Sequence, residues 1–303
     1  MMHLGSQFDI RAAVPDDAAS LFVVQAALAP TDAGQMPVWM QEMEERLESG
    51  GRAWVAARGR RLAGYALIDP LPGLPGDYDL SGGIVPARRR QGLGTRLLRH
   101  VQDAGRELGV GRLSCRVESL EDETATFLLR RGFSIEHEEC LLELGDLTDL
   151  PPVPTGPPAE LTTLEPEQAV ATFCRVYDAA FAGQPWSQPY TALEVAGALT
   201  DPDDLLFLMA GGEAIGVVWH EMLPNGRGRI EPIGIAPDYQ GRGYGRRLLI
   251  EALHRLRRRG ANPIEIGLWR RNDVAMNLYK SLGFSEEQNW YYLACDLAGL
   301  KTV

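Results

Sequence analysis

The sequence predicts two tandem copies of a domain in which strands alternate with helices. The chain has 303 residues, a length typical of about two domains. Similar segments recur without gaps from Pro86 to Phe133, and Pro86 corresponds to Pro237, 151 residues later. A repeat of this length is a whole domain and not the short unit of a solenoid.

The boundary between the two copies is marked by proline. Five prolines lie between positions 151 and 158, a composition that predicts an extended linker with few packing contacts. We therefore expect a first domain at 1–145, a linker at 146–160 and a second domain at 161–303.

Local patterns predict the same order of elements in both copies. Short apolar runs bounded by glycine and proline indicate strands, and apolar residues at helical spacing after a proline or acidic residue indicate helices. In the first copy we expect strands at 8–11, 53–57, 63–68, 78–85, 113–117 and before 144, with helices from 18 and at 38–48, 94–108 and 121–130. In the second copy we expect strands at 161–164, 205–209, 214–221, 229–236, 264–268 and 286–294, with helices at 165–181, 191–199, 246–259 and 275–282. Loops at 31–37 and 183–190 separate the first two helices of each copy.

The segment Gln240-Gly241-Arg242-Gly243-Tyr244-Gly245 joins an apolar strand to a helix. The unpaired N–H groups of such a turn and of the first helical turn converge and bind a phosphate, and glycine lets the phosphate approach the backbone. A glycine-rich connection without any ligand is the alternative, because a single pattern of this kind is weak. The matching segment Arg89-Arg90-Gln91-Gly92-Leu93-Gly94, which precedes Thr95, favours the phosphate site.

These loops and a later motif resemble the GNAT superfamily of N-acetyltransferases. The resemblance rests on Pro-x-x-[Gln/Arg]-x-x-Gly-x-Gly between a strand and a helix, followed by Asn272, Ala275, Leu278-Tyr279 and Leu282-Gly283-Phe284. It implies a mixed α/β fold, with a mostly antiparallel sheet flanked by helices and a splayed central strand pair. It also implies acetyl-coenzyme A as donor and a primary amine as acceptor. Two such domains in one chain resemble the architecture of mycothiol synthases.

The resemblance assigns cofactor contacts by position. Ile233, Gly234 and Ile235 correspond to the strand whose backbone binds pantetheine and the developing oxyanion. The pyrophosphate would lie on the glycine loop of the second copy, formed by Gln240, Gly241, Arg242, Gly243, Tyr244, Gly245 and Arg246. In the first copy the equivalent coenzyme A contacts are Ile84, Arg89, Arg90, Gln91, Gly92, Leu93, Gly94 and Thr95. No spacing of cysteine or histidine predicts a metal site.

Tyr279 and Asn272 match two further functional residues of the superfamily. Tyr279 corresponds to the general acid that protonates the coenzyme thiolate, and core packing on an apolar helix face is the alternative. Asn272 corresponds to a pantetheine contact, and it is also a good cap for the helix that follows.

Glu231 is the candidate general base. It lies two residues before Ile233, so strict strand alternation would place both side chains on one face, and members of the superfamily often carry an acidic base on this strand. His220 and Glu221 on the preceding strand compete for this role, and each could instead face solvent.

The first copy lacks all three residues. At the 151-residue offset, Leu128 replaces Tyr279, Glu121 replaces Asn272 and Leu80 replaces Glu231. We therefore expect the first domain to be non-catalytic, either binding coenzyme A without turnover or acting as a structural partner.

Composition restricts the remaining choices. The net charge of −11 argues against a nucleic-acid partner. No apolar run is long enough to span a membrane, so we expect a cytoplasmic protein, with four scattered cysteines as free thiols. The repeat makes a pseudo-dimer within one chain, either monomeric or homodimeric.

The sequence thus predicts an acetyl-coenzyme A-dependent N-acetyltransferase that acts by direct attack in its second domain. A coenzyme A-binding sensor or regulatory module without turnover is the alternative. A small amine, an aminoglycoside, a cysteinyl thiol precursor and a peptide N-terminus all remain open as acceptors.

Overall fold

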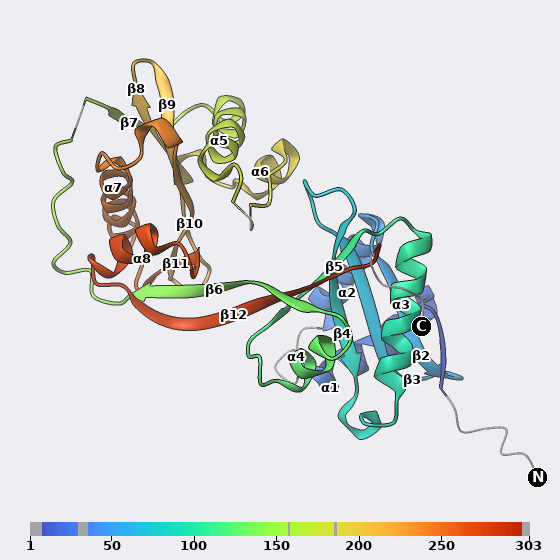
Figure 1. Ribbon diagram of the computed structural model, residues 1–303. Coiled ribbons are helices and arrows are strands. Elements are labelled where there is room, and N and C mark those ends of the chain that lie inside the picture. The colour runs from blue at the N-terminus through green and yellow to red at the C-terminus, as the bar shows by residue number, and fades with distance from the viewer. Residues whose placement is uncertain (1–7, 30–35, 157, 185–186, 299–303) are drawn as a thin grey trace, which may run out of the picture. The chain divides into compact units, whose positions relative to one another are not determined.

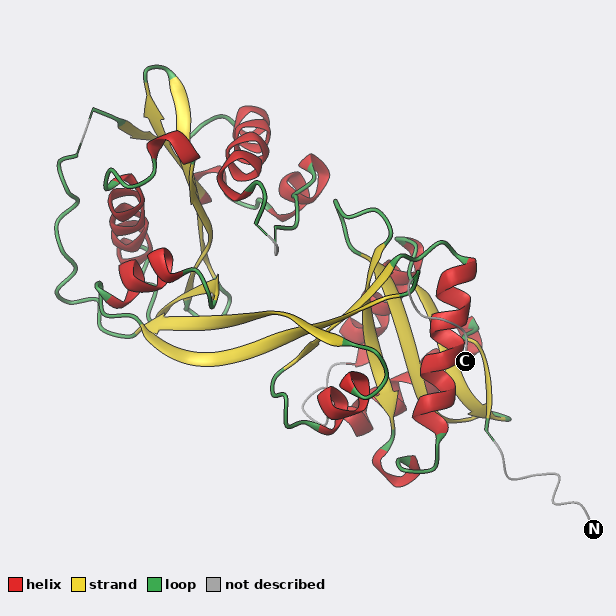
Figure 2. Cartoon of the chain, viewed as in Figure 1, coloured by secondary structure: helices red, strands yellow, loops and turns green. Residues whose placement is uncertain are grey.

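The computed structural model describes residues 8–29, 36–156, 158–184 and 187–298 and forms two compact units. Unit 1 contains Met1–Val117, Glu121–Glu136 and Tyr292–Val303, and unit 2 contains Glu118–Leu120 and His137–Tyr291. Each unit is a mixed sheet with helices on both faces (Figures 1 and 2). The predicted fold class is confirmed. None of the helices in the described ranges is long and apolar enough to cross a membrane.

Unit 1 follows the predicted order of elements. Its strands are β1 (Asp9–Ala12), β2 (Arg52–Arg58), β3 (Arg61–Pro70), β4 (Asp77–Ile84) and β5 (Arg112–Val117), and its helices are α1 (Ala18–Leu28), α2 (Met36–Glu48), α3 (Leu93–Glu107) and α4 (Glu123–Leu129). Neighbouring strands are antiparallel from β1 to β4, whereas β4 and β5 are parallel. Leu21 and Val24 of α1 and Met43 of α2 pack on Val55 and Leu67 of the sheet.

Unit 2 repeats this arrangement. Its strands are β7 (Glu160–Thr162), β8 (Leu205–Ala210), β9 (Glu213–Met222), β10 (Gly228–Ile235) and β11 (Ile264–Trp269), and its helices are α5 (Pro166–Phe181), α6 (Ala192–Ala198), α7 (Tyr244–Arg258) and α8 (Asp273–Lys280). Helices α5 and α6 cover one face of the sheet, and α7 and α8 cover the other (Figure 1). We call these the α5 face and the α7 face. Part of the loop predicted at 183–190, and most of the one at 31–37, lie outside the described residues.

The last strand of each sequence copy pairs in the other copy's unit. Strand β6 (Ser134–Leu144) follows α4 of the first copy but pairs antiparallel with β11 in unit 2. Strand β12 (Ser285–Asp296) begins in unit 2 and enters unit 1, where it is the neighbour of β5. It is one long strand, not the separate closing strands that the sequence predicts. The compact units therefore differ from the sequence-based ranges: residues 118–120 and 137–160 belong to unit 2, and β12 enters unit 1 from Tyr292.

The parallel strand pair in each unit is hydrogen-bonded only at its start. Strands β10 and β11 pair from Gly228 to Ile230 and no further, although β10 stays paired with β9 as far as Ile235. Strands β4 and β5 likewise pair only from Asp77 to Asp79. The central strands thus part in both units, as the splayed pair of the predicted fold requires.

The strand exchange predicts that a buried residue from one half of the sequence stabilises the unit formed mainly by the other half. Leu297 packs against Gly105 of α3 in unit 1, whereas Leu144 belongs to the core of unit 2. Each leucine-to-alanine change should lower the free energy of unfolding by roughly 2 to 5 kcal/mol. Native-state hydrogen exchange should show lost protection in unit 1 for Leu297→Ala and in unit 2 for Leu144→Ala. Lost protection in unit 2 for Leu297→Ala and in unit 1 for Leu144→Ala would contradict the exchange of strands.

Candidate active site

The second glycine loop has a backbone that only a few residue types tolerate. Gly241 and Gly243 have φ of +71° and +85°, in the left-handed region that favours glycine. Gly243 caps α7 without any side-chain cap, and the first bond of the helix runs from the Arg247 N–H to the Gly243 carbonyl. The N–H groups before Arg247 therefore have no acceptor within the helix. A Cβ at Gly241 or Gly243 would meet no atom within 4 Å, so the loop borders open space.

The first glycine loop repeats this geometry. Gly92 caps α3 with φ of +77°, and Arg90 takes the left-handed conformation that Gly241 has in the second loop. Both loops are tied to the end of the preceding strand by equivalent side chains. Gln240 donates from Nε2 to the Ile235 carbonyl at 2.9 Å, and Arg89 donates from Nε to the Ile84 carbonyl at 3.0 Å. These two predicted cofactor residues thus also hold the loops in place.

Several other predicted loop residues have side chains that face the protein. Tyr244 and Leu93 are buried, so only their backbone groups are available to a ligand. Arg246 donates to the Ser281 hydroxyl at 2.8 Å, and the Thr95 hydroxyl accepts from Arg131 at the same distance. Gly245 and Gly94 lie close to Ile235 and Ile84, which lets each helix pack near its strand. Arg242 lies over the ring of Tyr239, and Gln91 is exposed.

Gly234 has a packing role. A Cβ at this position would lie 2.9 Å from Ala180 and 3.0 Å from Phe181, both on α5. The glycine therefore allows α5 to approach β10 directly beside the point where β10 and β11 part.

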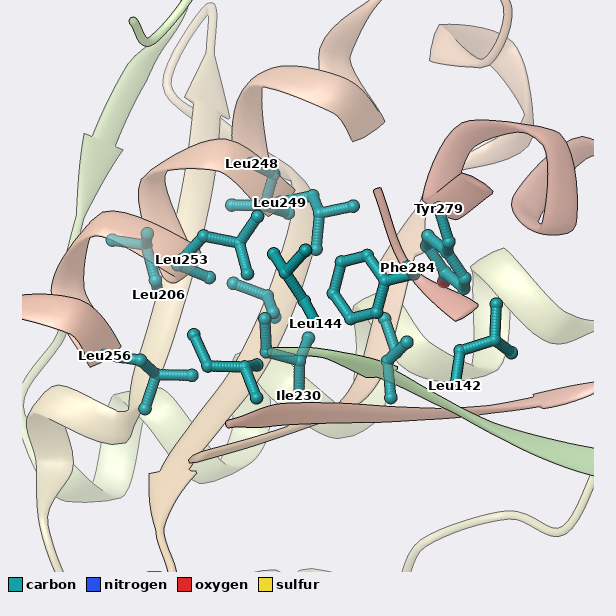
Figure 3. Close-up of a cluster of buried hydrophobic side chains, with 14 of the residues drawn as sticks. Leu142, Leu144, Leu206, Ile230, Leu248, Leu249, Leu253, Leu256, Tyr279 and Phe284 are labelled. Carbon is teal, nitrogen blue, oxygen red and sulfur yellow. The ribbon is translucent and has the colours of Figure 1, made fainter. Parts of the chain in front are cut away.

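Tyr279 is buried on α8, with its ring 6.0 Å from that of Phe284 (Figure 3). It lies in the same hydrophobic cluster as Leu142 and Leu144 of the exchanged strand β6. Burial raises the pKa of its phenol, and the negative charge of Glu231 raises it further. Tyr279 is therefore both a core residue and a protonated phenol within electrostatic reach of the candidate base.

Glu231 lies at a β-bulge. The register between β10 and β9 shifts between Ile230 and Ile233, so one extra residue separates them. Ile230 and Ile233 both contact the core on the α7 face. The carboxyl group of Glu231 instead lies against Gly267, where an added Cβ would be 2.9 Å from Oε2. The prediction that Glu231 and Ile233 share a face is wrong, because the bulge interrupts the alternation.

The surroundings of Glu231 favour its protonated form. Its side chain reaches solvent, yet the surrounding protein raises the pKa of the carboxyl, and the charge of Glu139 raises it further. Glu265 and Glu221 act in the same direction, and Arg229 opposes them. These groups make Glu231 a weaker acid than an ordinary glutamate, as is common for a general base.

Comparisons with known proteins agree with this geometry. The model of the acetyltransferase (GNAT) family matches residues 22–133 and 170–284, so it finds the domain twice. This chain belongs to that family.

Two mycothiol acetyltransferases are similar to most of the GNAT chain. The protein from Thermomonospora curvata is 30% identical over 279 residues, which cover 89% of this chain and 91% of that protein. The protein from Nocardia farcinica is 31% identical over 278 residues, covering 86% and 88%. The chain is thus an enzyme of the N-acetyltransferase class with a tandem GNAT architecture.

Two solved structures share the tandem fold. A GCN5-related N-acetyltransferase from Sphaerobacter thermophilus superposes with a TM-score of 0.68 at 20% identity, covering 97% of both chains. A tandem GNAT protein from the clavulanic acid biosynthesis pathway gives a TM-score of 0.67 at 17% identity, covering 98% of this chain and all of that one.

The two competing bases of the second GNAT domain are engaged elsewhere. His220 is buried, and its Nδ1 lies 2.7 Å from the Asp204 carbonyl. Burial lowers the pKa of His220 to about 4, so its ring is neutral near pH 7. Its strand position shares a face with Val218, which packs on the α7 face and away from Glu231. Glu221 lies 3.8 Å from Arg229 in an ion pair.

Asn272 caps α8. Its side-chain oxygen accepts a hydrogen bond from the Ala275 N–H at 3.1 Å. The capping alternative is therefore confirmed, and the contact to pantetheine stays a prediction.

The first GNAT domain has apolar side chains at the positions that correspond to the candidate acid and base of the second. Leu80 and Leu128 are both buried, and neither can transfer a proton. On the α2 side of its sheet, Arg46 forms an ion pair with Asp69 and lies 3.3 Å from the Ser81 hydroxyl. This face of the first domain is thus cross-linked by its own side chains.

Of three further residues near Glu231, sequence reasoning did not assign Tyr177 or Glu139 to the site, and it placed Tyr190 only in the loop at 183–190. Tyr177 of α5 and Tyr190 before α6 have ring centroids 4.8 Å apart, and both pKa values are raised by burial and by the charge of Glu231, that of Tyr190 to about 12. Glu139 belongs to the first copy and reaches unit 2 only through the strand exchange. The spacing of Phe173, Tyr177 and Phe181 was visible in the sequence, but it is equally typical of a helix core.

Proposed function

We propose that the chain transfers an acetyl group from acetyl-coenzyme A to a primary amine, and that the second GNAT domain contains its catalytic centre. The observation that carries this proposal is that the Glu231 carboxyl, beside the point where β10 and β11 part, raises the pKa of the buried Tyr279 phenol beyond the effect of burial. The positions that correspond to them in the first domain are leucines.

The second glycine loop fits the pyrophosphate of coenzyme A. Backbone N–H groups from Gly241 to Arg246 surround the uncapped start of α7, and open space at Gly241 and Gly243 leaves room for the phosphates. The backbone of Ile233 and Ile235, beyond the last residue of β10 that pairs with β11, would bind pantetheine and the carbonyl oxygen of the thioester. Acetyl-coenzyme A supplies the activated acetyl group.

In the reaction, the ammonium form of the acceptor loses two protons and the sulfur gains one. Glu231 accepts a proton from the ammonium form of the acceptor, and the free nitrogen lone pair attacks the thioester carbon. The carbonyl oxygen becomes negatively charged and is stabilised by backbone N–H groups. As the carbon–sulfur bond breaks, Tyr279 donates its proton to the thiolate. The nitrogen loses its second proton as the amide forms, and a proton from solvent restores the Tyr279 phenol. Glu231 releases its proton to solvent, and the amide and free coenzyme A leave.

The first domain is proposed to bind coenzyme A without turnover. Its loop has the same left-handed cap at Gly92 as the second loop has at Gly243, which supports binding. The absence of ionisable groups at Leu80 and Leu128 supports the lack of turnover. Relatives named mycothiol acetyltransferase favour a small-molecule acceptor over a peptide N-terminus.

Replacing Tyr279 by phenylalanine should lower kcat by roughly 10- to 10⁴-fold, because the leaving thiolate loses its proton donor. The buried ring stays in place, so acetyl-coenzyme A affinity should hardly change. Thiol release with a panel of amines measures kcat, and calorimetry measures the affinity. An unchanged kcat, with chemistry shown to be rate-limiting, would remove Tyr279 from the mechanism.

Replacing Glu231 by glutamine should remove the acidic limb of the pH–rate profile. The wild-type base is active when ionised, and its pKa lies above the ordinary value, so kcat/KM should rise with pH through that raised pKa. Glu231→Gln cannot ionise and should lower kcat/KM by roughly 10²- to 10⁴-fold near neutral pH. A variant that keeps the wild-type profile would show that another group is the base.

Gly243→Glu should abolish coenzyme A binding at the second site, because it brings a side chain and a negative charge into the phosphate site. Gly260→Glu is a matched control, since Gly260 has φ of +87° and open space at its Cβ but lies at the other end of α7. It should bind normally, and Gly92→Glu should keep most turnover. Calorimetry that shows wild-type affinity at the second site of folded Gly243→Glu would overturn the loop assignment.

A further inference from the structure

Glu139 lies on the same face as the candidate base, although it comes from the first copy of the sequence. Strand β6 pairs with β11 so that Leu141 is opposite Gly267 and Glu139 is opposite Trp269. Cys140, Leu142 and Leu144 of β6 contact the α7-face core, so the odd-numbered residues between them face α5. The carboxyl of Glu231 rests on Gly267. Diagonal neighbours on paired strands lie about 7 to 8 Å apart, which is the expected spacing from Gly267 to Glu139.

The Glu139 carboxylate is held in a fixed position. Trp290 of β12 donates its indole N–H to Oε2 at 2.9 Å, and His137 Nε2 lies 3.2 Å from Oε1. About a quarter of the Glu139 side chain remains exposed. Because an ionised carboxylate accepts up to about four hydrogen bonds, these two contacts leave room for a cationic ligand.

The other carboxylates on this face are neutralised by arginine. Glu265 accepts hydrogen bonds from both Arg227 and Arg229, and Glu143 pairs with Arg227. Within the described ranges, neither Glu139 nor Glu231 forms an ion pair with arginine or lysine. A nearby negative charge disfavours the ionised form of a carboxyl group, and Glu139 raises the pKa of Glu231 in this way.

Tyr177 and Tyr190 also lie in a negative electrostatic field. The charged side chains that raise the pKa values of Tyr177 and Tyr190 are all carboxylates, namely Asp178, Glu139, Glu194, Glu221 and Glu231. An acceptor with a single ammonium group would place that group at Glu231. Once the group loses its proton for the attack, no positive charge of the acceptor remains near Glu139. A second cationic group on the acceptor would remain charged and supply it.

We propose that Glu139 is a specificity-determining residue of the second GNAT domain, where it binds a second cationic group on the acceptor while Glu231 serves the reacting nitrogen. The substrate class is therefore an amine with a second basic nitrogen about 7 Å from the first, as the sheet spacing indicates. This inference rests on the proposed function. The exchanged strand thereby brings a residue of the first sequence copy into the recognition site of the second.

The test compares putrescine with pentylamine, in which a methyl group replaces one of the two ammonium groups. The wild type should acetylate putrescine with a kcat/KM at least about tenfold higher than pentylamine, mainly through a lower KM, because Glu139 binds the second ammonium group. A tenfold ratio corresponds to about 1.4 kcal/mol. Glu139→Gln should bring the ratio of the two values close to one. Diamines with three and five carbons show how sharply the spacing is selected.

Glu143→Gln is the matched control, because Glu143 lies on the same strand and face but pairs with Arg227. It should keep the wild-type ratio. A wild type that does not prefer putrescine, including one that acetylates neither amine, overturns the inference, as does a Glu139→Gln variant with an unchanged ratio. The proposed function is judged separately, by thiol release with the wider amine panel in the Tyr279 and Glu231 variants.

Discussion

The β-bulge at Glu231-Pro232 is the feature on which the proposed chemistry depends. Proline has no N–H to give to a neighbouring strand, and it is found in sheets mainly at edges and bulges. In the first domain β4 runs beside β3 without any register shift, and Leu80 is buried. The one extra residue in β10 moves Glu231 from that apolar position to the opposite face of the sheet. One extra residue in the strand thus explains why Leu80 is a core residue in the first domain, whereas Glu231 lies on the opposite face in the second.

The separation of β10 and β11 allows Glu231, at the bulge, to act on Tyr279 across the sheet. Strands β10 and β11 stop pairing after Ile230 and Ile266. Beyond these residues, no hydrogen bonds between the two strands separate the two faces of the sheet. Glu231 on the α5 face and Tyr279 on the α7 face can therefore influence each other. A continuous sheet would leave a base and an acid on opposite sides of a layer of backbone, where they could not serve one reacting centre.

The sequence allowed the elements and both glycine loops to be predicted, because these depend on local signals. Left-handed caps need glycine, and a helix that packs on a sheet needs apolar residues at helical spacing, as Leu248, Leu249 and Leu253 of α7 show. Local signals do not predict which strands pair with each other. Strands β6 and β12 have the same alternation whichever unit they join, so their exchange, and with it the position of Glu139, had no local signal. The direction of Glu231 was mispredicted because alternation was assumed through Pro232.

The exchange of closing strands also constrains how the chain reaches its native state. Residues 292–296 of β12 complete the sheet edge at β5 in unit 1, yet they are synthesised only after most of the second sequence copy. A nascent chain that has finished α4 still has an open edge on its first sheet, with unpaired backbone groups of the kind that pair with other chains. Contacts between residues so distant in sequence form slowly. The sheet of unit 1 can therefore be completed only after the second sequence copy has been synthesised as far as β12.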